Sequence, residues 1–167
     1  MIIDFDLDLL KQLINIIDYQ LEIISQKASN VDDADSLGYY DSAEHITGLG
    51  FVACQTYMSS VYGYLKIDKQ HALSLGPLHS SGQTKVQIIN HVANYWKHNN
   101  EWSLEKEDNR RKQIEKAFES VGFPVNTDYP ISGVLYKIVY PDRATFEPII
   151  TILELWRNEL LEMKKNN

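Results

Sequence analysis

The stretch that decides the fold is DLDLLKQLINIIDYQLEIISQK, residues 6–27. Its aliphatic side chains recur with the i, i+3, i+4, i+7 spacing that gathers them on one face of an α-helix. They are Leu10, Leu13, Ile14, Ile17, Leu21 and Ile24. This stripe predicts a helix from about Asp6 to Lys27. Because a lone helix of this length is marginal in water, the stripe must be buried against other helices.

Helical spacing continues along most of the chain. Residues 130–139 fit a helix better than a strand, since their apolar side chains follow helical spacing and Pro130 suits a first turn. The other predicted helices span residues 42–65, 68–75, 84–99, 105–120 and 145–164. Long amphipathic helices joined by short loops predict an all-α fold, a helical bundle of about five to seven helices. The 167 residues suit one domain that spans the whole chain, 1–167.

A few residues mark where the predicted helices begin and end. Thr84 is a suitable N-cap for the helix that follows it, and Ser42 is the candidate N-cap of an earlier helix. Gly122, with Pro124 just beyond it, is the expected ending of another helix.

The formal net charge of −7 is unevenly placed along the chain. Residues 1–50 hold ten Asp or Glu and two Lys, a net charge of −8. The remaining 117 residues hold 13 acids and 14 bases, a net charge of +1. Bulk electrostatic binding of nucleic acid needs a positive face, so it is not expected. A local contact with RNA from the near-neutral remainder stays open.

Residues 46–65 contain no charged side chain over about the length that a membrane span requires. Four polar residues interrupt the middle of this stretch and indicate a buried central helix instead: Gln55, Thr56, Ser59 and Ser60. Gly48 and Gly50 near its start would let another helix approach closely. The acidic N-terminus does not look like a signal peptide, and the single cysteine, Cys54, fits a reducing compartment. We therefore expect a soluble cytoplasmic protein.

The helix predicted over residues 84–99 divides into two arcs. The apolar arc, which we assign to the core, contains Ile88, Ile89, Val92, Ala93, Tyr95 and Trp96. The polar arc contains Gln87, Asn90, His91, Asn94, Lys97 and His98. Solvated helix faces are usually rich in Glu, Lys and Arg, yet this arc has one Lys and no acid. Two interpretations stay open: a solvated face, and a polar groove or functional site.

Two kinds of chemistry are disfavoured by the residue pattern. His91 and His98 lie about 10.5 Å apart along a helix, too far to bind one metal ion, and the chain has no CxxC or HExxH motif. Cys54 lies in a very apolar helix, where a thiol is usually packed and unreactive. We expect no cofactor.

The acidic segment DADSLGYYDSAE, residues 33–44, follows one predicted helix and precedes another. The ligand positions and the turn glycine of a calcium-binding EF-hand loop are matched in part by Asp33, Asp35, Gly38, Asp41 and Glu44. Leu37 removes one ligand, however, and the chain has no second loop to pair with. A solvated acidic loop is therefore the favoured interpretation, and calcium binding is the alternative.

The all-α pattern and the stretch NYWKHNNEW, residues 94–102, resemble the HEPN superfamily of small helical prokaryotic proteins, which are often dimeric. Its active members are metal-independent ribonucleases with a motif of an Arg, usually a polar residue, a short spacer and a His. His98 matches this His, and Asn94 is the nearest polar partner. No Arg precedes His98 in the chain. Lys97 could supply the positive charge, and so could two arginines on the next helix, Arg110 and Arg111.

The resemblance implies acid–base chemistry at His98 and stabilisation of phosphate charge by neighbouring cations. Because the motif Arg is missing, a noncatalytic member that binds a nucleotide, RNA or a protein partner is favoured over an active ribonuclease. Asn90 and His91 would extend the binding surface, and Trp102 could stack on a base. The resemblance also implies a homo-oligomer, and a role in a defence or toxin–antitoxin system.

A second hypothesis belongs to another class of protein. The acidic first third would suit a helical interaction or immunity-type protein that binds a basic partner without catalysis. Asp32, Asp33 and Asp35 would lie on that surface.

Overall fold

The computed structural model describes residues 5–104 and 108–166. Within these ranges the chain forms seven α-helices, one short 3-10 helix and no β-strand, which confirms the predicted all-α fold. The elements are α1 (Phe5–Ser29), α2 (Tyr39–Leu65), α3 (Lys69–Leu73), α4 (Lys85–His98), η1 (Asn99–Glu101), α5 (Asn109–Val121), α6 (Pro130–Val139) and α7 (Glu147–Asn166).

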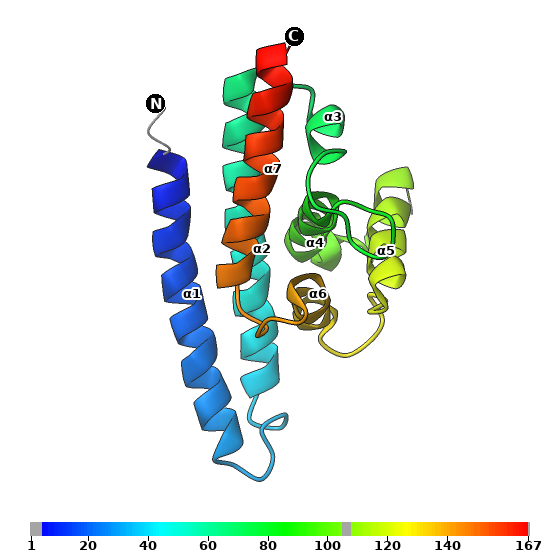
Figure 1. Ribbon diagram of the computed structural model, residues 1–167. Coiled ribbons are helices and arrows are strands. Elements are labelled where there is room, and N and C mark those ends of the chain that lie inside the picture. Colours follow the sequence, from blue (N-terminus) through cyan, green and yellow to red (C-terminus); the bar gives the residue numbers. More distant parts are fainter. Residues whose placement is uncertain (1–4, 105–107, 167) are drawn as a thin grey trace.

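Helix α2 is the centre of the arrangement (Figure 1). It packs against α1 and α4 and also contacts α6 and α7. The shorter helices α4, α5 and α6 form a second group beside it, with α4 in contact with the other two. Helix α1 lies at one edge of the bundle and α5 at the opposite edge. The end of α4 and the start of α5 therefore lie far from α1.

One hydrophobic core receives buried side chains from all seven described α-helices. The fully buried indole of Trp156 donates a hydrogen bond of 2.7 Å from Nε1 to the carbonyl oxygen of Ala72, which joins α7 to α3. Phe51 and Phe146 meet edge to face, with ring centroids 5.2 Å apart. The core assignment of Leu13 is wrong, because this side chain of α1 is 42% exposed.

Gly48 and Gly50 of α2 are sites of close approach, as predicted. A Cβ atom on Gly48 would lie 1.8 Å from Cδ1 of Trp96, and one on Gly50 would lie 2.3 Å from Cζ of Phe146. Real Cβ atoms do not come so close to other carbons. Any larger residue would therefore push an aromatic ring out of place.

The predicted caps can be compared with the helix ends. Thr84 caps α4: its hydroxyl accepts the Gln87 N–H at 3.1 Å, and the Gln87 side chain accepts the Thr84 N–H at 3.1 Å. Gly122 ends α5 with a φ of 91°, as expected. The Ser42 prediction is wrong. Helix α2 begins earlier, after Gly38 with a φ of 72°, and the Ser42 hydroxyl donates to the Gly38 carbonyl.

The start of α7 is set by a residue of α1. The Asp18 carboxylate accepts the N–H groups of Phe146 and Glu147 at 2.8 and 3.0 Å. The first N–H groups of a helix have no partner within the helix, and Asp18 supplies one for these two. Helix α7 therefore begins at Glu147, two residues later than the predicted start at residue 145.

The uncharged segment over residues 46–65 belongs to α2 and contributes one face to the core, whereas Leu49, Thr56 and Tyr64 on its other side are exposed. In the part of the chain that the structure describes, no helix is both long enough and apolar enough to cross a membrane.

Candidate functional site

A pocket of about 170 Å³ lies where the end of α4, η1 and the start of α5 meet. We call it the α4–α5 pocket. Four of the predicted site residues line it: His98, Trp102, Arg110 and Arg111. Glu101, Asp108 and Ile114 complete the wall. The fold thus brings together polar side chains from two successive helices.

The end of α4 turns the chain toward this pocket. Asn99 follows the last residue of α4, and its side-chain amide donates to the carbonyl oxygens of Tyr95 and Trp96 at 2.9 and 3.2 Å. Free carbonyl groups at a helix end need such partners. The side-chain bonds therefore stabilise the transition from α4 to the 3-10 helix, and they hold His98 at the pocket wall.

The start of α5 forms the opposite wall. The Asp108 carboxylate accepts the Arg111 N–H at 2.8 Å and caps the helix. The helix therefore begins at Asn109, whereas a start near residue 105 was predicted, and residues 105–107 lie outside the described ranges. The cap places the first-turn residues Arg110 and Arg111 beside the end of α4.

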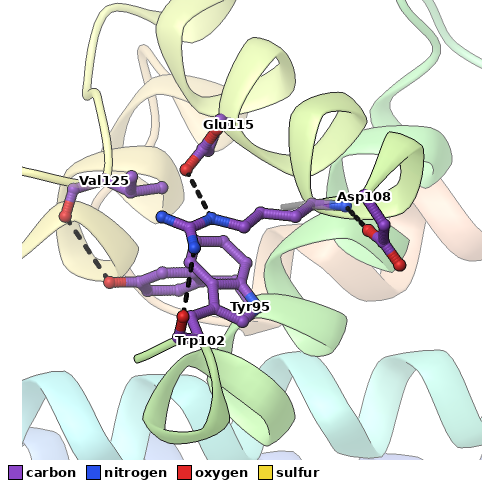
Figure 2. Close-up of polar contacts among 6 residues, drawn as sticks. Tyr95, Trp102, Asp108, Glu115 and Val125 are labelled. Carbon is purple, nitrogen blue, oxygen red and sulfur yellow. Dashed lines mark hydrogen bonds and ion pairs between the residues drawn. The ribbon is translucent and has the colours of Figure 1, made fainter. Parts of the chain in front are cut away.

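Arg111 and Trp102 are held against each other. The Arg111 guanidinium lies over the indole ring, 4.7 Å from its centroid, and donates to the Trp102 carbonyl at 3.2 Å and to Glu115 at 3.0 Å. Tyr95 packs edge-on against Trp102, and its hydroxyl donates to the Val125 carbonyl (Figure 2). The indole face under Arg111 is therefore not free to stack on a base. Both residues chiefly build the pocket wall.

His98 has the geometry of an acid–base group. Its Nδ1 lies 3.3 Å from a carboxylate oxygen of Glu101, and its side chain is 38% exposed. A carboxylate at this position favours a proton on Nδ1, which leaves Nε2 as the proton acceptor. Among the described residues, none makes a hydrogen bond with Nε2. This nitrogen is therefore open to a hydrogen bond with a ligand in the pocket.

The two asparagines of the polar arc do not line the pocket. Asn90 and Asn94 are buried between α4 and α2, where the Gln55 amide donates to their side-chain oxygens at 2.9 and 3.0 Å. Lys97 in turn donates to the other end of Gln55, its Oε1 atom, at 2.7 Å. We call these four residues the amide network. The solvated-face interpretation is wrong for Asn90 and Asn94, because Gln55 satisfies them inside the protein.

Gln55 is the residue that the site prediction missed. The sequence marked it only as a polar interruption of an otherwise apolar segment. A buried polar side chain needs a hydrogen-bond partner. For Gln55 the partners are the side-chain oxygens of Asn90 and Asn94.

Four cationic or titratable groups influence one another electrostatically, and one of them, Arg110, lines the pocket. Burial lowers the pKa of Lys97, and the positive charges of Arg110 and Lys69 lower it further. Burial and the Lys69 charge likewise lower the pKa of His91. We call Lys69, His91, Lys97 and Arg110 the basic cluster. The partner of Lys97 in the amide network is neutral, so no carboxylate in the described structure offsets this lysine. Lys97 thus lies in the field of two other cations, Arg110 and Lys69.

The acidic segment over residues 33–44 does not form a calcium loop. Glu44 instead caps α6: its carboxylate accepts the N–H groups of Ile131 and Ser132 at 2.7 and 2.9 Å. Asp33 bonds to Ser36, and Asp35 accepts the Tyr129 hydroxyl. Asp41 lies within α2. No three His, Cys, Asp or Glu side chains of the described ranges are placed to hold a metal ion. The described residues of this segment therefore form no assembled calcium site.

Cys54 is inert in this fold, as predicted. Its side chain is fully buried in the core, and burial raises the pKa of the thiol far above its ordinary value. A thiol that stays protonated is a poor nucleophile.

Comparison with known proteins adds no relative: no family model, no curated protein and no solved structure matches this chain.

Proposed function

We propose that the chain is a HEPN-like cytoplasmic protein whose α4–α5 pocket binds a phosphate group of RNA or of a nucleotide. One observation carries this proposal: Arg110 and His98 line one pocket, and Lys97, which bonds to the neutral Gln55, lies within the electrostatic reach of Arg110 and Lys69. Neighbouring positive charges repel one another, and a bound anion relieves that repulsion.

The pocket wall holds two carboxylates as well as two guanidinium groups, and each carboxylate has a local partner. Glu101 is occupied with His98, and Asp108 is occupied with the start of α5. The described structure records no ion pair for the exposed Arg110. Its guanidinium can therefore bind two phosphate oxygens at once, the geometry that arginine favours.

The size of the pocket limits what it can enclose. About 170 Å³ is less than the roughly 300 Å³ at the small end of ordinary ligand sites. A phosphate and part of a sugar are suited to this volume, whereas a base would extend over the surface. This favours recognition of the backbone of RNA over recognition of its sequence.

The same residues would serve a ribonuclease. His98 Nε2 would accept the proton of the 2′-hydroxyl as the O2′–P bond forms and the P–O5′ bond breaks, water would protonate the departing 5′-oxygen, and Arg110 would stabilise the added charge. In this protein the Arg would come from the helix after His98, whereas in the HEPN motif the Arg precedes the His. Binding without cleavage is therefore the primary proposal.

The charge reversal Arg110→Glu tests the pocket. We expect it to weaken binding of a labelled single-stranded RNA at least about tenfold, or ~1.4 kcal/mol, because a phosphate contact becomes a repulsion. Fluorescence anisotropy at low and moderate salt measures the affinity and its salt dependence. Lys116→Glu is the matched control, since Lys116 is an exposed cation of α5 outside the pocket wall.

His98→Ala separates binding from cleavage. A binding protein keeps much of its affinity in this variant, whereas a ribonuclease loses turnover and still binds RNA. The proposal fails if the wild-type protein neither binds nor cleaves RNA and binds no nucleotide, or if Arg110→Glu and Lys116→Glu behave alike.

A second candidate function is the binding of a basic protein partner. A pocket of about 320 Å³ between α2, α4 and α6 has aromatic walls, Tyr95, Trp96 and Tyr129, with Asp41 and Asp128 in its lining. The hydrogen bond to Asp35, with the charges of Asp35, Asp41 and Asp128, raises the pKa of Tyr129 to about 12. Aromatic faces and carboxylates together attract a guanidinium or ammonium group.

An arginine-rich peptide tests this second candidate. The double variant Asp41→Lys, Asp128→Lys is expected to reduce peptide affinity at least about tenfold relative to wild type. The double variant Glu119→Lys, Asp142→Lys is the control, because it changes the net charge by the same amount at two exposed acids that do not line the pocket. Equal losses in both proteins would assign the effect to net charge and reject the pocket.

A further inference from the structure

Helix α1 has a second apolar face that nothing in the described chain covers. Its buried stripe faces α2 and α7, and the opposite side carries five large exposed hydrophobic residues. They are Phe5 (73% exposed), Leu9 (56%), Leu13 (42%), Ile16 (65%) and Tyr19 (69%). At 100° per residue these five side chains fall within one arc of about 120°. Figure 1 shows α1 at the edge of the bundle, with no helix beyond it.

This outer face of α1 lacks charge over most of the helix. Between Phe5 and Ile23 its only polar members are two amides, Gln12 and Gln20. The first charged residue on the arc is Lys27, in the last turn. Solvated helix faces usually carry charged residues, and a contiguous apolar strip of this length marks an interaction surface.

We propose that a second copy of this chain covers the outer face, with the two α1 helices packed antiparallel about a two-fold axis at Ile16. In this register Ile16 meets the same residue of the second copy. Leu13 lies opposite Tyr19, and Leu9 lies opposite Ile23. Every apolar side chain of the outer face from Leu9 to Ile23 then contacts an apolar side chain of the second copy, as a self-complementary interface requires.

The ends of the helix fix its direction. The register places Lys27 of each copy beside Phe5 and the first-turn acid Asp8 of the other copy, while Asp6 is held by Ser60 of α2. A parallel pair would instead place like charges together at both ends. Antiparallel helices also align their dipoles favourably.

The area is sufficient for a specific dimer. Taking about 150–250 Å² for an aromatic side chain, and somewhat less for an aliphatic one, the five side chains expose roughly 500–600 Å² per copy. A pair of copies would therefore bury roughly 1,000–1,200 Å², which reaches the lower limit for specific protein interfaces. The contact would extend for roughly 33 Å along the helix.

The substitution Ile16→Arg tests this interface, because it sets two arginines against each other on the axis. Wild type at tens of micromolar is expected to sediment at twice the chain mass of 19.3 kDa, and the variant at the single mass. We expect the dimer dissociation constant to rise at least about 30-fold. Leu78→Arg is the control, since Leu78 is 69% exposed outside α1 and should leave the dimer intact. Circular dichroism melting checks that both variants remain folded.

A charge exchange tests the antiparallel direction. Lys27→Glu alone should weaken the dimer, and adding Asp8→Lys should restore it, because the two charges change places. A monomeric wild type overturns the proposal, and so does a folded Ile16→Arg variant that stays dimeric. A dimer that Asp8→Lys fails to rescue overturns the antiparallel register. These outcomes are independent of RNA binding, since α1 lies at the opposite edge of the bundle from α5, whose first turn lines the α4–α5 pocket.

Discussion

Replacement of Trp156 by alanine is expected to lower the free energy of unfolding by about 3–5 kcal/mol. The indole is fully buried in the core, so its removal leaves a cavity that rigid helices cannot fill. The change also removes the donor to the Ala72 carbonyl, which is then left without its partner on α7. Because a domain of this size is stable by roughly 5–15 kcal/mol, the loss could bring it close to unfolding.

Urea unfolding followed by circular dichroism measures this loss. Leu155→Ala is the matched control. Leu155 is next to Trp156 on α7 but is 54% exposed, so this substitution should change the free energy of unfolding by no more than about 0.5 kcal/mol. Trp156→Phe should fall between the two, since the phenyl ring fills much of the space and lacks the N–H group. A Trp156→Ala protein as stable as the Leu155→Ala protein would contradict the packing described for α7.

Replacement of Gln55 by leucine is expected to lower the free energy of unfolding by about 2–4 kcal/mol. Leucine has a similar size but no polar atoms, so the buried oxygens of Asn90 and Asn94 lose their donor. Each unsatisfied buried group costs about 1–3 kcal/mol. Lys97 also loses its acceptor.

Two further substitutions separate the amide network from simple packing. Gln55→Glu should be milder than Gln55→Leu, because a carboxylate still accepts from Lys97 and the asparagine amides can rotate to present their NH₂ groups. Thr56→Ala is the control, since this exposed hydroxyl donates only to the Val52 carbonyl of its own helix. Equal stability of Gln55→Leu and Thr56→Ala in urea would show that the network does not stabilise the fold.

The fold class was predictable because it depends on local patterns. The spacing of Leu10, Ile14 and Ile17 is a property of a few consecutive turns, and it needs no knowledge of the rest of the chain. Leu13 shows the limit of this reasoning. Helix α1 is apolar on two sides, and the pattern alone does not tell which side meets α2 and which faces outward.

The candidate site was predictable only in part. The sequence singled out His98 and Arg110, and the cap at Asp108 brings them to one pocket. The burial of Asn90 and Asn94 could not be predicted from α4 alone, because it depends on Gln55, 35 residues or more earlier in the chain. The calcium motif failed for the same reason, since Glu44 bonds to residues 87 and 88 positions away.

That long-range cap has a consequence for the dynamics of the fold. The N–H hydrogens of Ile131 and Ser132 in the first turn of α6 are held by Glu44 of α2, and not by α6 itself. Their exchange with deuterium therefore reports whether α6 is docked on α2, independently of whether α6 is helical. Hydrogen exchange at these two amides would therefore detect an opening motion in which α6 separates from α2.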